Sequence, residues 1–355
     1  MNPNVLKGLL IILVILDHND FARSVIPEFL RGLSFHVVGF MALPFLRDSM
    51  RPFTAQFAQY AFRLYYPFAM VTCALALAAY FIKDVPVPVH VQATLLALYS
   101  GNWKVLDQVT GMGLLWFLPS LVALLLLRAV VESLPRYAGA ALLALACVAH
   151  FFVGFIKPPA QAFFPMGLLP ALYVLPLAYL IALVHKRALE RIPTWLAVLL
   201  TVGVFAVVKL VQMRMNFTNE IGFLQVATHT RPLRMLFNDL EAVTGSLMLF
   251  QVARCFRWSL AEKCGQFSMQ VYLIHAFIAA ALFRAALMLP RINSPVAAFL
   301  ISLGLTVVIS VVLVTYVLRF SAVRRFVFPR STNDLHQHHP APLRSETAAV
   351  DGRSK

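Results

Sequence analysis

The sequence has little charge, and acidic residues are especially scarce. Asp, Glu, Lys and Arg together make up 13% of its 355 residues, and hydrophobic residues make up 60%. Soluble globular domains carry about 25% charged residues. The composition therefore excludes an ordinary soluble domain and indicates a membrane protein with several spans.

A net charge of +15 arises because 30 basic residues face only 15 acidic ones. These Lys and Arg residues stand in short clusters between apolar segments, without a basic stripe interleaved with exposed aromatic residues. A nucleic-acid partner is therefore not expected. We interpret the clusters as signals that set membrane topology.

Only four cysteines are present, and none has CxxC or other metal-binding spacing, so neither a disulfide framework nor a cysteine metal site is expected. His336, His338 and His339 lie in a polar segment where nothing fixes a ligand set, and we predict no metal site. The sequence also lacks a Gly-rich phosphate loop and a G-x-S-x-G nucleophile turn.

Apolar segments of about 20 residues predict an all-α integral membrane fold, a bundle of about ten transmembrane helices. The first has an uninterrupted apolar part of only about a dozen residues, a length that also suits a helix buried inside a bundle. The predicted helices cover residues 4–22, 26–46, 57–82, 113–133, 137–156, 167–186, 194–212, 235–254, 265–289 and 294–319.

An even number of spans with both termini in the cytoplasm places most Lys and Arg residues on the inside. Residues 83–112 and 213–234 are then longer outside loops, and residues 92–100 are too short to cross, so we interpret them as re-entrant or interfacial. Residues 1–327 form the predicted membrane domain. Residues 328–355 are polar without an apolar period and are expected to be a disordered cytoplasmic tail.

Ionisable groups in membrane segments cost about 2.5 to 3.5 kcal/mol each, so each needs a partner, water or a task. Lys7 and His18 are eleven residues apart. In a helix this spacing places them within about 20° of one face and about 16 Å apart. Asp17 and Asp20 lie on other faces, about 100° and 200° away. One stripe therefore presents a cation near the cytoplasm and an imidazole deeper in the membrane.

That stripe suits a reaction between an anionic cytoplasmic cofactor and an acceptor hydroxyl, since histidine takes a proton near neutral pH. Two structural alternatives remain: Lys7 snorkels to the interface, and the polar run 17–20 caps a helix end. Further candidates are His36, Arg63, Glu241, and Ser268 with His275, which share one helix face. His36 is equally explained as a buried histidine bonded to a carbonyl, and Arg63 as a topology signal.

Five segments, in order, resemble the acyltransferase 3 family of multipass membrane O-acyltransferases. The stretch KGLLIILVILDH is similar to the first-helix motif of that family, a basic residue and a histidine separated by ten others, matched by Lys7 and His18. FHVVGFMALPFL resembles the second-helix segment FHMPLFFFLSG. RLYYPF resembles RLLxPY, GLLWFLPSLVALLL resembles LWFLPALF, and FSMQVYLIHAFI resembles SLxIYLIH. The similarity extends from residue 6 to about residue 285.

The resemblance implies transfer of an acyl group, commonly acetyl from cytoplasmic acyl-CoA, to a hydroxyl of a carbohydrate or lipid-linked glycan in the bacterial inner membrane. No cofactor is expected to stay bound, and other polysaccharide-synthesis proteins are a candidate partner class. The candidate residues are, for catalysis, His18, Asp17, His36 and Glu241; for the acyl-CoA, Lys7, Arg63, Arg47 and Arg51; and for the acceptor, Asn19, Asp20, Trp116, Ser268 and His275.

The sequence departs from the family pattern at two places. The family often carries an RxxR pair at its third helix, but Tyr60 stands three residues before Arg63. Leu43 and Pro44, or residues near them, replace the serine and glycine of the second-helix motif. Both departures affect the site for the donor phosphates, where Arg47, Arg51 and Lys7 are candidates for the missing charge.

Two other functions fit a bundle with intramembrane charges. One is a secondary transporter or flippase, although the sequence shows no inverted repeat and no matching pair of interrupted helices. The other is a scaffold that kept the bundle without catalysis. Without a serine or cysteine in a nucleophile setting, direct transfer is preferred over a covalent intermediate, with an acyl-histidine as the open alternative.

Overall fold

The computed structural model describes residues 2–328, apart from residues 20, 27–34, 48–52, 83–84, 154–155, 157, 216–231, 256–257 and 288–293. All regular elements in these described residues are helices, which confirms the predicted all-α membrane fold. The expected tail, residues 328–355, lies outside the described residues except for Phe328.

The elements follow the predicted spans closely, and several pairs join into longer helices. In chain order they are α1 (Pro3–Asp17), α2 (Ala22–Val25), α3 (Phe35–Ala42), η2 (Leu43–Leu46), α4 (Phe53–Tyr60), η3 (Ala61–Tyr65), α5 (Tyr66–Tyr80), α6 (Val87–Ser100), α7 (Trp103–Thr110), η4 (Gly113–Trp116), α8 (Phe117–Ser133), α9 (Arg136–Val153), α10 (Pro158–Gln161), η5 (Pro165–Gly167), α11 (Leu168–Arg187), η6 (Leu189–Arg191), α12 (Thr194–Arg214), α13 (Pro232–Cys255), α14 (Ser259–Gln266), α15 (Ser268–Leu287), α16 (Pro295–Val317) and α17 (Ser321–Phe326).

Six helices of the described chain are long and apolar enough to cross a membrane, and α14 with α15 makes a seventh if that bent pair is one span. The predicted number of about ten is therefore not confirmed. Two predicted spans are shorter helices here, since α1 has 15 residues and α3 with η2 covers only Phe35–Leu46. Helix α13 has 24 residues, but polar groups including Asp239 and Glu241 interrupt its apolar sequence.

Two segments differ from the sequence expectation. The predicted outside loop 83–112 contains two helices, α6 and α7, each followed by a glycine with positive φ that ends it. The predicted helix 265–289 corresponds to α15, and the structure adds a short helix before it, α14, which meets α15 at an angle of 98°. Phe267 stands at this bend, between the two helices.

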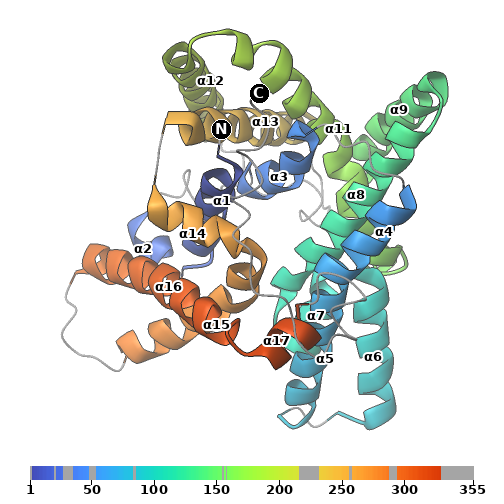
Figure 1. Ribbon diagram of the computed structural model, residues 1–355, viewed down its shortest axis with the longest axis vertical. Coiled ribbons are helices and arrows are strands. Elements are labelled where there is room, and N and C mark those ends of the chain that lie inside the picture. Colours follow the sequence, from blue (N-terminus) through green and yellow to red (C-terminus); the bar gives the residue numbers. More distant parts are fainter. Residues whose placement is uncertain are drawn as a thin grey trace, which may run out of the picture.

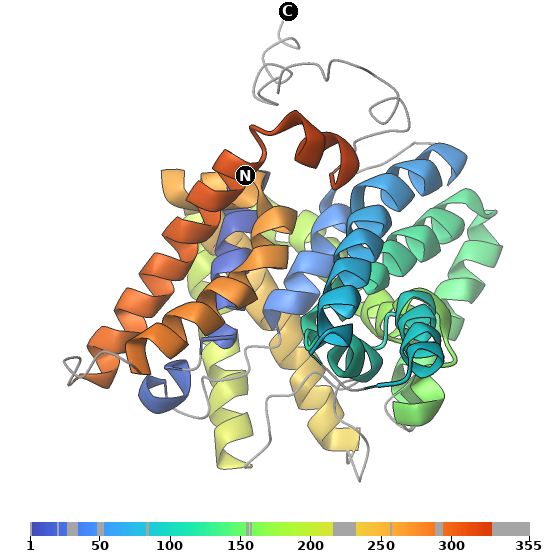
Figure 2. The same ribbon diagram turned by 90° about the horizontal axis from the view of Figure 1, so that it is seen from below.

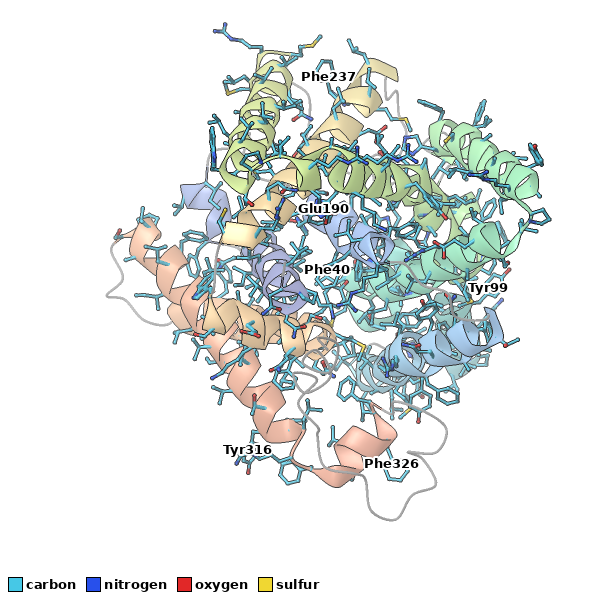
Figure 3. The ribbon with its side chains drawn as sticks, turned by 45° about the horizontal axis from the view of Figure 1, so that its top comes forward. Phe40, Tyr99, Glu190, Phe237, Tyr316 and Phe326 are labelled. Carbon is cyan, nitrogen blue, oxygen red and sulfur yellow. The ribbon has the colours of Figure 1, made fainter. Side chains whose placement is uncertain are left out.

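Helix α1 lies in the middle of the bundle, with α3, α13, α14 and α15 around it (Figure 1). Phe40 of α3 also lies near the centre of the molecule, whereas Tyr316 and Phe326 lie at its edge (Figure 3). The start of α1 and helix α17 are at one end of the molecule (Figure 2). The C-terminal end of α12 and the start of α13 project at the opposite end.

The outer faces of the long helices are apolar. Helix α12 exposes Leu199, Val207 and Leu210, and α16 exposes Leu300 and Val312. Large exposed apolar side chains on several neighbouring helices are uncommon in soluble proteins, but they are the surface that lipid requires. The chain is a multipass membrane protein.

Two glycines allow the backbones of α1 and α14 to touch. A Cβ added at Gly8 would lie 1.7 Å from the carbonyl oxygen of Ala261, and one added at Gly265 would lie 1.7 Å from that of Asn4. Small residues at a crossing permit such an approach between membrane helices. The start of α1 is further held by Asn2, whose side-chain amide donates to Glu262 at 2.9 Å. This packing fixes the helix that carries Lys7 and leads to His18.

We predict that Gly8→Val separates α1 from α14 and lowers the midpoint of thermal unfolding of the purified protein, since overpacking costs about 1 to 3 kcal/mol or more. Gly203→Val and Gly304→Val are matched controls, because nothing lies within 4 Å of an added Cβ at either position. An unchanged midpoint for Gly8→Val would contradict the contact between the two backbones.

Candidate functional site

His18 directly follows α1 and caps its C-terminal end. Its Nδ1 lies 2.7 Å from the carbonyl oxygen of Val14, which also accepts the backbone N–H of His18 at 3.2 Å. A carbonyl oxygen can only accept a hydrogen bond, so Nδ1 carries the proton of the neutral ring and Nε2 has the lone pair. The side chain is only partly buried. His18 therefore offers a base with a fixed tautomer.

His275 of α15 packs against His18. The two rings meet edge to face with centroids 5.7 Å apart, and His275 is fully buried. Its Nδ1 lies 2.7 Å from the carbonyl oxygen of Tyr272, which fixes the same tautomer as in His18. Tyr272 donates its hydroxyl to the carbonyl of Leu114, and its ring packs on Phe117. These contacts hold the imidazole pair between α1, α15 and the start of α8.

The polar residues beside His18 differ in their surroundings. Asn19 is buried; its amide nitrogen donates to Ser302 of α16 at 3.3 Å, and its oxygen accepts the N–H of Phe21 at 3.0 Å. It therefore ties the end of α1 to α16. Asp17 is exposed at the last position of α1. Asp20 lies outside the described residues.

The structure places the remaining candidates of the second and ninth predicted helices at the ends of elements. His36 is buried near the start of α3, and the neighbouring carbonyl of Phe35 accepts the hydroxyl of Ser246 at 3.1 Å. Ser268 is the first residue of α15 and is partly buried. The roles of His36 and Ser268 stay predictions, and among the described residues His275 is the candidate whose ring packs directly on His18.

Glu241 has a partner that the sequence reading missed. Its carboxylate is fully buried and lies 2.5 Å from Nζ of Lys209 on α12. One turn away, the amide nitrogen of Gln212 donates to the side-chain oxygen of Asn238 at 3.2 Å. The Lys209–Glu241 pair is buried and joins α12 to α13. A lysine within the apolar run VFAVVKLVQM was the signal for it.

A second buried pair joins α9, α11 and α13. Nε2 of His150 lies 2.8 Å from the carboxylate of Asp239, and its Nδ1 lies 2.7 Å from the carbonyl oxygen of Tyr173. The hydroxyl of Tyr173 also donates to Asp239, and the ring of Tyr173 stacks on that of His150. Both ring nitrogens face acceptors, so the geometry suits the imidazolium form, which neutralises Asp239. His150 and Asp239 were likewise missed.

The candidate residues for an anionic donor lie on different elements. Lys7 is partly buried in the first half of α1. Arg47 is exposed at the end of η2, and Arg63 is exposed in η3, a π-helical turn between α4 and α5. Such π-helical turns are rare and often occur at functional sites. Arg51 lies outside the described residues.

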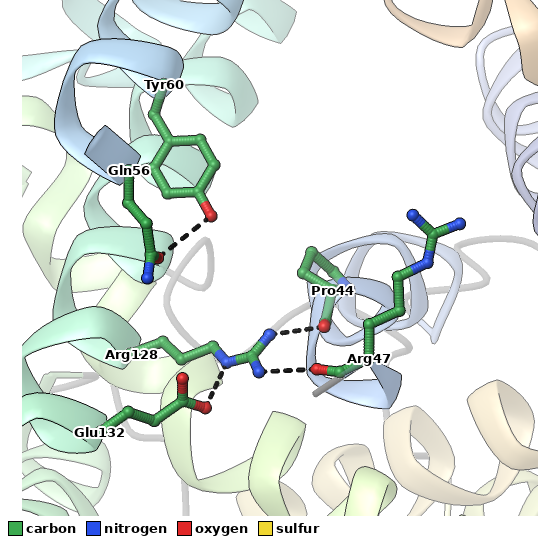
Figure 4. Close-up of polar contacts among 6 residues, drawn as sticks. All are labelled: Pro44, Arg47, Gln56, Tyr60, Arg128 and Glu132. Atoms are coloured by element: carbon green, nitrogen blue, oxygen red, sulfur yellow. Dashed lines mark hydrogen bonds and ion pairs between the residues drawn. The ribbon is translucent and has the colours of Figure 1, made fainter. Parts of the chain in front are cut away.

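A buried arginine of α8 holds the backbone beneath Arg47 (Figure 4). Arg128 donates from its two terminal nitrogens to the carbonyls of Pro44, at 2.5 Å, and Arg47, at 2.8 Å. Its Nε donates to Glu132 at 2.6 Å, and its guanidinium lies over the ring of Phe45, 4.9 Å from the centroid. Sequence reasoning assigned Arg128 to topology only. In the structure, each of its three guanidinium nitrogens donates a hydrogen bond.

Trp116 lines a small pocket near the start of α8. The pocket lies between the end of α6, the start of α7, and the turns η4 and η5. Polar groups of Ser100, Asn102 and Gln161 line it together with the rings of Trp103 and Trp116. Trp116 also contacts Phe117, the residue on which Tyr272 packs. The pocket is therefore connected through aromatic side chains to His275 and His18.

No group of three or more His, Cys, Asp or Glu side chains with metal-binding geometry occurs in the described part of the chain. The four cysteines are free thiols, three of them exposed. The described residues include an imidazole base, a partly aromatic pocket and exposed arginines. These groups suit proton abstraction from a hydroxyl and the binding of an anion.

We predict that Lys209→Met destabilises the protein by about 3 to 5 kcal/mol, because it leaves the charge of Glu241 buried without a partner. The double variant Lys209→Met and Glu241→Met should recover most of that loss, since an apolar pair of similar volume fills the same space. Thermal unfolding of the variants measures both effects. If the loss of stability in the double variant equals the sum of the losses in the two single variants, Lys209 and Glu241 do not stabilise each other.

The double variant also separates a structural role of Glu241 from a catalytic one. If it retains the activity of the native protein, Glu241 acts only as the partner of Lys209. If stability returns but activity does not, Glu241 or Lys209 takes part in the reaction, as the sequence predicted for Glu241.

No curated protein and no solved structure matches the chain. A model of the acyltransferase 3 family, described as an acyltransferase domain, matches residues 2–315, which include α1, the imidazole pair and nearly all of α16. The chain belongs to the acyltransferase 3 family and is a membrane acyltransferase.

Proposed function

We propose that the protein transfers an acyl group, most simply acetyl, from cytoplasmic acyl-CoA to a hydroxyl of a carbohydrate or lipid-linked glycan. The proposal includes an inner-membrane location with both termini in the cytoplasm. The observation that carries it is the state of His18, whose Nδ1 is bonded to Val14 and whose Nε2 is a base. In a membrane acyltransferase, a histidine base of this kind suits a hydroxyl acceptor, because it takes the proton of the hydroxyl as the oxygen attacks.

In the proposed reaction, Nε2 of His18 takes the proton of the acceptor hydroxyl while its oxygen attacks the thioester carbonyl. The C–O bond forms, the C–S bond breaks, and the thiolate of CoA leaves and takes the proton from the imidazolium. The carbonyl of Val14 accepts from Nδ1 throughout and stabilises the imidazolium that forms. His275 holds the ring of His18 in place by edge-to-face packing.

The donor is proposed to bind at the end of the molecule where α1 begins. Arg47 and Arg63 are exposed, and a guanidinium matches the oxygens of a diphosphate. Lys7 and His18 lie about 16 Å apart along α1 at 1.5 Å per residue. An extended pantetheine arm bridges a distance of this order, so phosphates near the cytoplasmic cations are compatible with a thioester near His18.

The acceptor is proposed to bind through the pocket of Trp103 and Trp116. Aromatic rings with a few polar groups are typical of sites that hold amphipathic ligands, and the two faces of a sugar ring suit this combination. Asn102 and Gln161 supply amide groups for hydroxyls. The ring of Trp116 contacts that of Phe117, on which Tyr272 packs, and this chain of rings supports the proposal.

The test of the proposed base is to replace His18 with Gln, which keeps a polar side chain without a basic nitrogen. Acetyl transfer from labelled acetyl-CoA to membrane glycans should fall by about 10²-fold or more, the contribution expected of a general base. His90→Gln is the control, because within the described residues the ring of this partly buried histidine of α6 bonds the carbonyl of Ala76, at 2.8 Å. Equal turnover of the native protein and His18→Gln would remove His18 from the reaction.

The test of the acceptor pocket uses Trp103, which is partly exposed. Trp103→Ala should raise KM for the glycan about tenfold, equivalent to about 1.4 kcal/mol, and leave KM for acetyl-CoA unchanged. Trp103→Phe should keep most of the affinity, and Trp195→Ala, at an exposed position of α12, should change neither constant. A rise in KM for acetyl-CoA would place the donor in this pocket instead.

A transporter or flippase predicts a different result in the same system. Purified protein in vesicles would move an unmodified glycan across the bilayer, and no label from acetyl-CoA would appear on it. The scaffold hypothesis predicts neither result. Label on the glycan, lost in His18→Gln, is expected only from the enzyme.

A further inference from the structure

We propose that Arg128 is a positioning residue for the acyl donor, because its guanidinium fixes the backbone that directs Arg47 toward the phosphates of acyl-CoA. This inference rests on the proposed function, which assigns acyl-CoA as donor. It adds a residue that neither the family motifs nor the sequence pattern assigned to the donor site.

Arg128 defines the conformation of the chain at Arg47. The 3₁₀ turn η2 ends at Leu46, and Arg47 has extended backbone angles, φ −102° and ψ 135°. The end of such a turn leaves carbonyl groups without partners. The two terminal nitrogens of Arg128 bind two carbonyls here, that of Pro44, which also accepts the backbone N–H of Arg47 at 3.2 Å, and that of Arg47 itself. The backbone of Arg47 is thereby held in place, and Figure 4 shows its side chain pointing away from Arg128.

The charges of the cluster leave Arg47 available to an anion. Glu132 lies 2.6 Å from Nε of Arg128 and neutralises it, and the guanidinium of Arg128 bonds the backbone carbonyl of Arg47, not its side chain. In the described part of the chain, the guanidinium of Arg47 has no ion-pair partner and is exposed. The cluster therefore carries one net positive charge, and that charge stands on the side chain that points away from the pair.

Helix α8 also packs against the segment that carries Arg63, the second exposed arginine proposed for the donor. It packs against α4 and against η3, the π-helical turn that contains Arg63. The side chain of Arg128 reaches η2 from the same helix, so α8 joins the segments that carry Arg47 and Arg63. Arg128 is itself 7% exposed. A buried arginine is costly in a membrane protein, and such residues are rare outside functional sites.

The forked arrangement of the arginine N–H groups is required to position Arg47 in this way. Lysine has the same charge as arginine but presents its donors from one nitrogen, so it does not hold two carbonyls and a carboxylate in fixed directions. Arg128→Lys should therefore preserve the charge and disturb the direction of Arg47. This difference separates positioning from simple electrostatic attraction.

The experiment compares acetyl-CoA with S-acetylpantetheine, a donor that carries the same thioester but lacks the diphosphate. Arg128→Lys and Arg47→Gln should each raise KM for acetyl-CoA about tenfold. Neither should change KM for S-acetylpantetheine or for the glycan. The double variant should be no worse than Arg47→Gln alone, since Arg128 acts through Arg47.

Arg136→Gln is the control for loss of a cation at this end, because Arg136 is exposed at the start of α9. It should leave KM for acetyl-CoA unchanged. Glu132→Gln keeps both carbonyl contacts and is the second variant if Arg128→Lys folds poorly. It should raise KM for acetyl-CoA by about threefold and spare S-acetylpantetheine, since only the side carboxylate contact is weakened.

An equal rise in KM for acetyl-CoA and for S-acetylpantetheine in Arg128→Lys would overturn the inference, because it would assign Arg128 a structural role only. An unchanged KM for acetyl-CoA in Arg128→Lys, or in Glu132→Gln where that variant is used, would also overturn it. Failure of the proposed function looks different: the native protein would then use neither thioester and would not bind CoA in calorimetry.

Discussion

The cost of placing ionisable side chains in a bilayer decides how this structure is organised. Each such group costs about 2.5 to 3.5 kcal/mol at the centre of a helix, and the cost falls when the group is paired. Lys209 with Glu241, His150 with Asp239, and Arg128 with Glu132 are all paired across or along helices. The imidazole of His18 is partly solvated instead, and within the described residues its hydrogen bond is to the backbone carbonyl of Val14. Pairing therefore separates groups that hold the bundle from a group that is free to react.

The buried pairs all concern helices that surround the short helices α1 and α3. Helix α13 contributes Asp239 and Glu241 to two different neighbours, α9 and α12. Its hydroxyl group of Ser246 binds the first carbonyl of α3, beside His36. Opposite charges bound in fixed geometry give the bundle directional contacts, which apolar packing in lipid does not provide. The position of the imidazole pair thus depends on contacts made some distance from it.

The sequence predicted the fold class and most helix boundaries, because long apolar runs have a direct physical meaning in a membrane. It did not predict α6 and α7, whose residues include too many polar groups and too short an apolar run to resemble spans. It also did not predict the bend between α14 and α15, which is a property of packing. Spacing within one helix was informative for Lys7 and His18, whereas partners from distant helices, such as Lys209 and Arg128, require three-dimensional contacts.

The same distinction applies to the candidate site. The motif placed His18 on α1, and the helix period placed Ser268 and His275 on one face, but neither could show that His275 lies against His18. Asn19 was expected to bind substrate, and its side chain is already bonded to Ser302 and the backbone of Phe21. A polar residue near a reactive group can be there to fix the chain, and its hydrogen-bond partners distinguish the two cases.

The end of α1 explains why a histidine occupies this position. At 1.5 Å per residue, its 15 residues span about 22 Å, less than the roughly 30 Å of the hydrocarbon core. A helix that starts near one surface therefore ends inside the membrane, where its last carbonyls lack helical partners. The carbonyl of Val14 already accepts the backbone N–H of His18, and the Nδ1–H of His18 is a second donor to the same oxygen. The side chain thus bonds back to the end of its own helix at this depth, which leaves Nε2 as the base that proton abstraction requires.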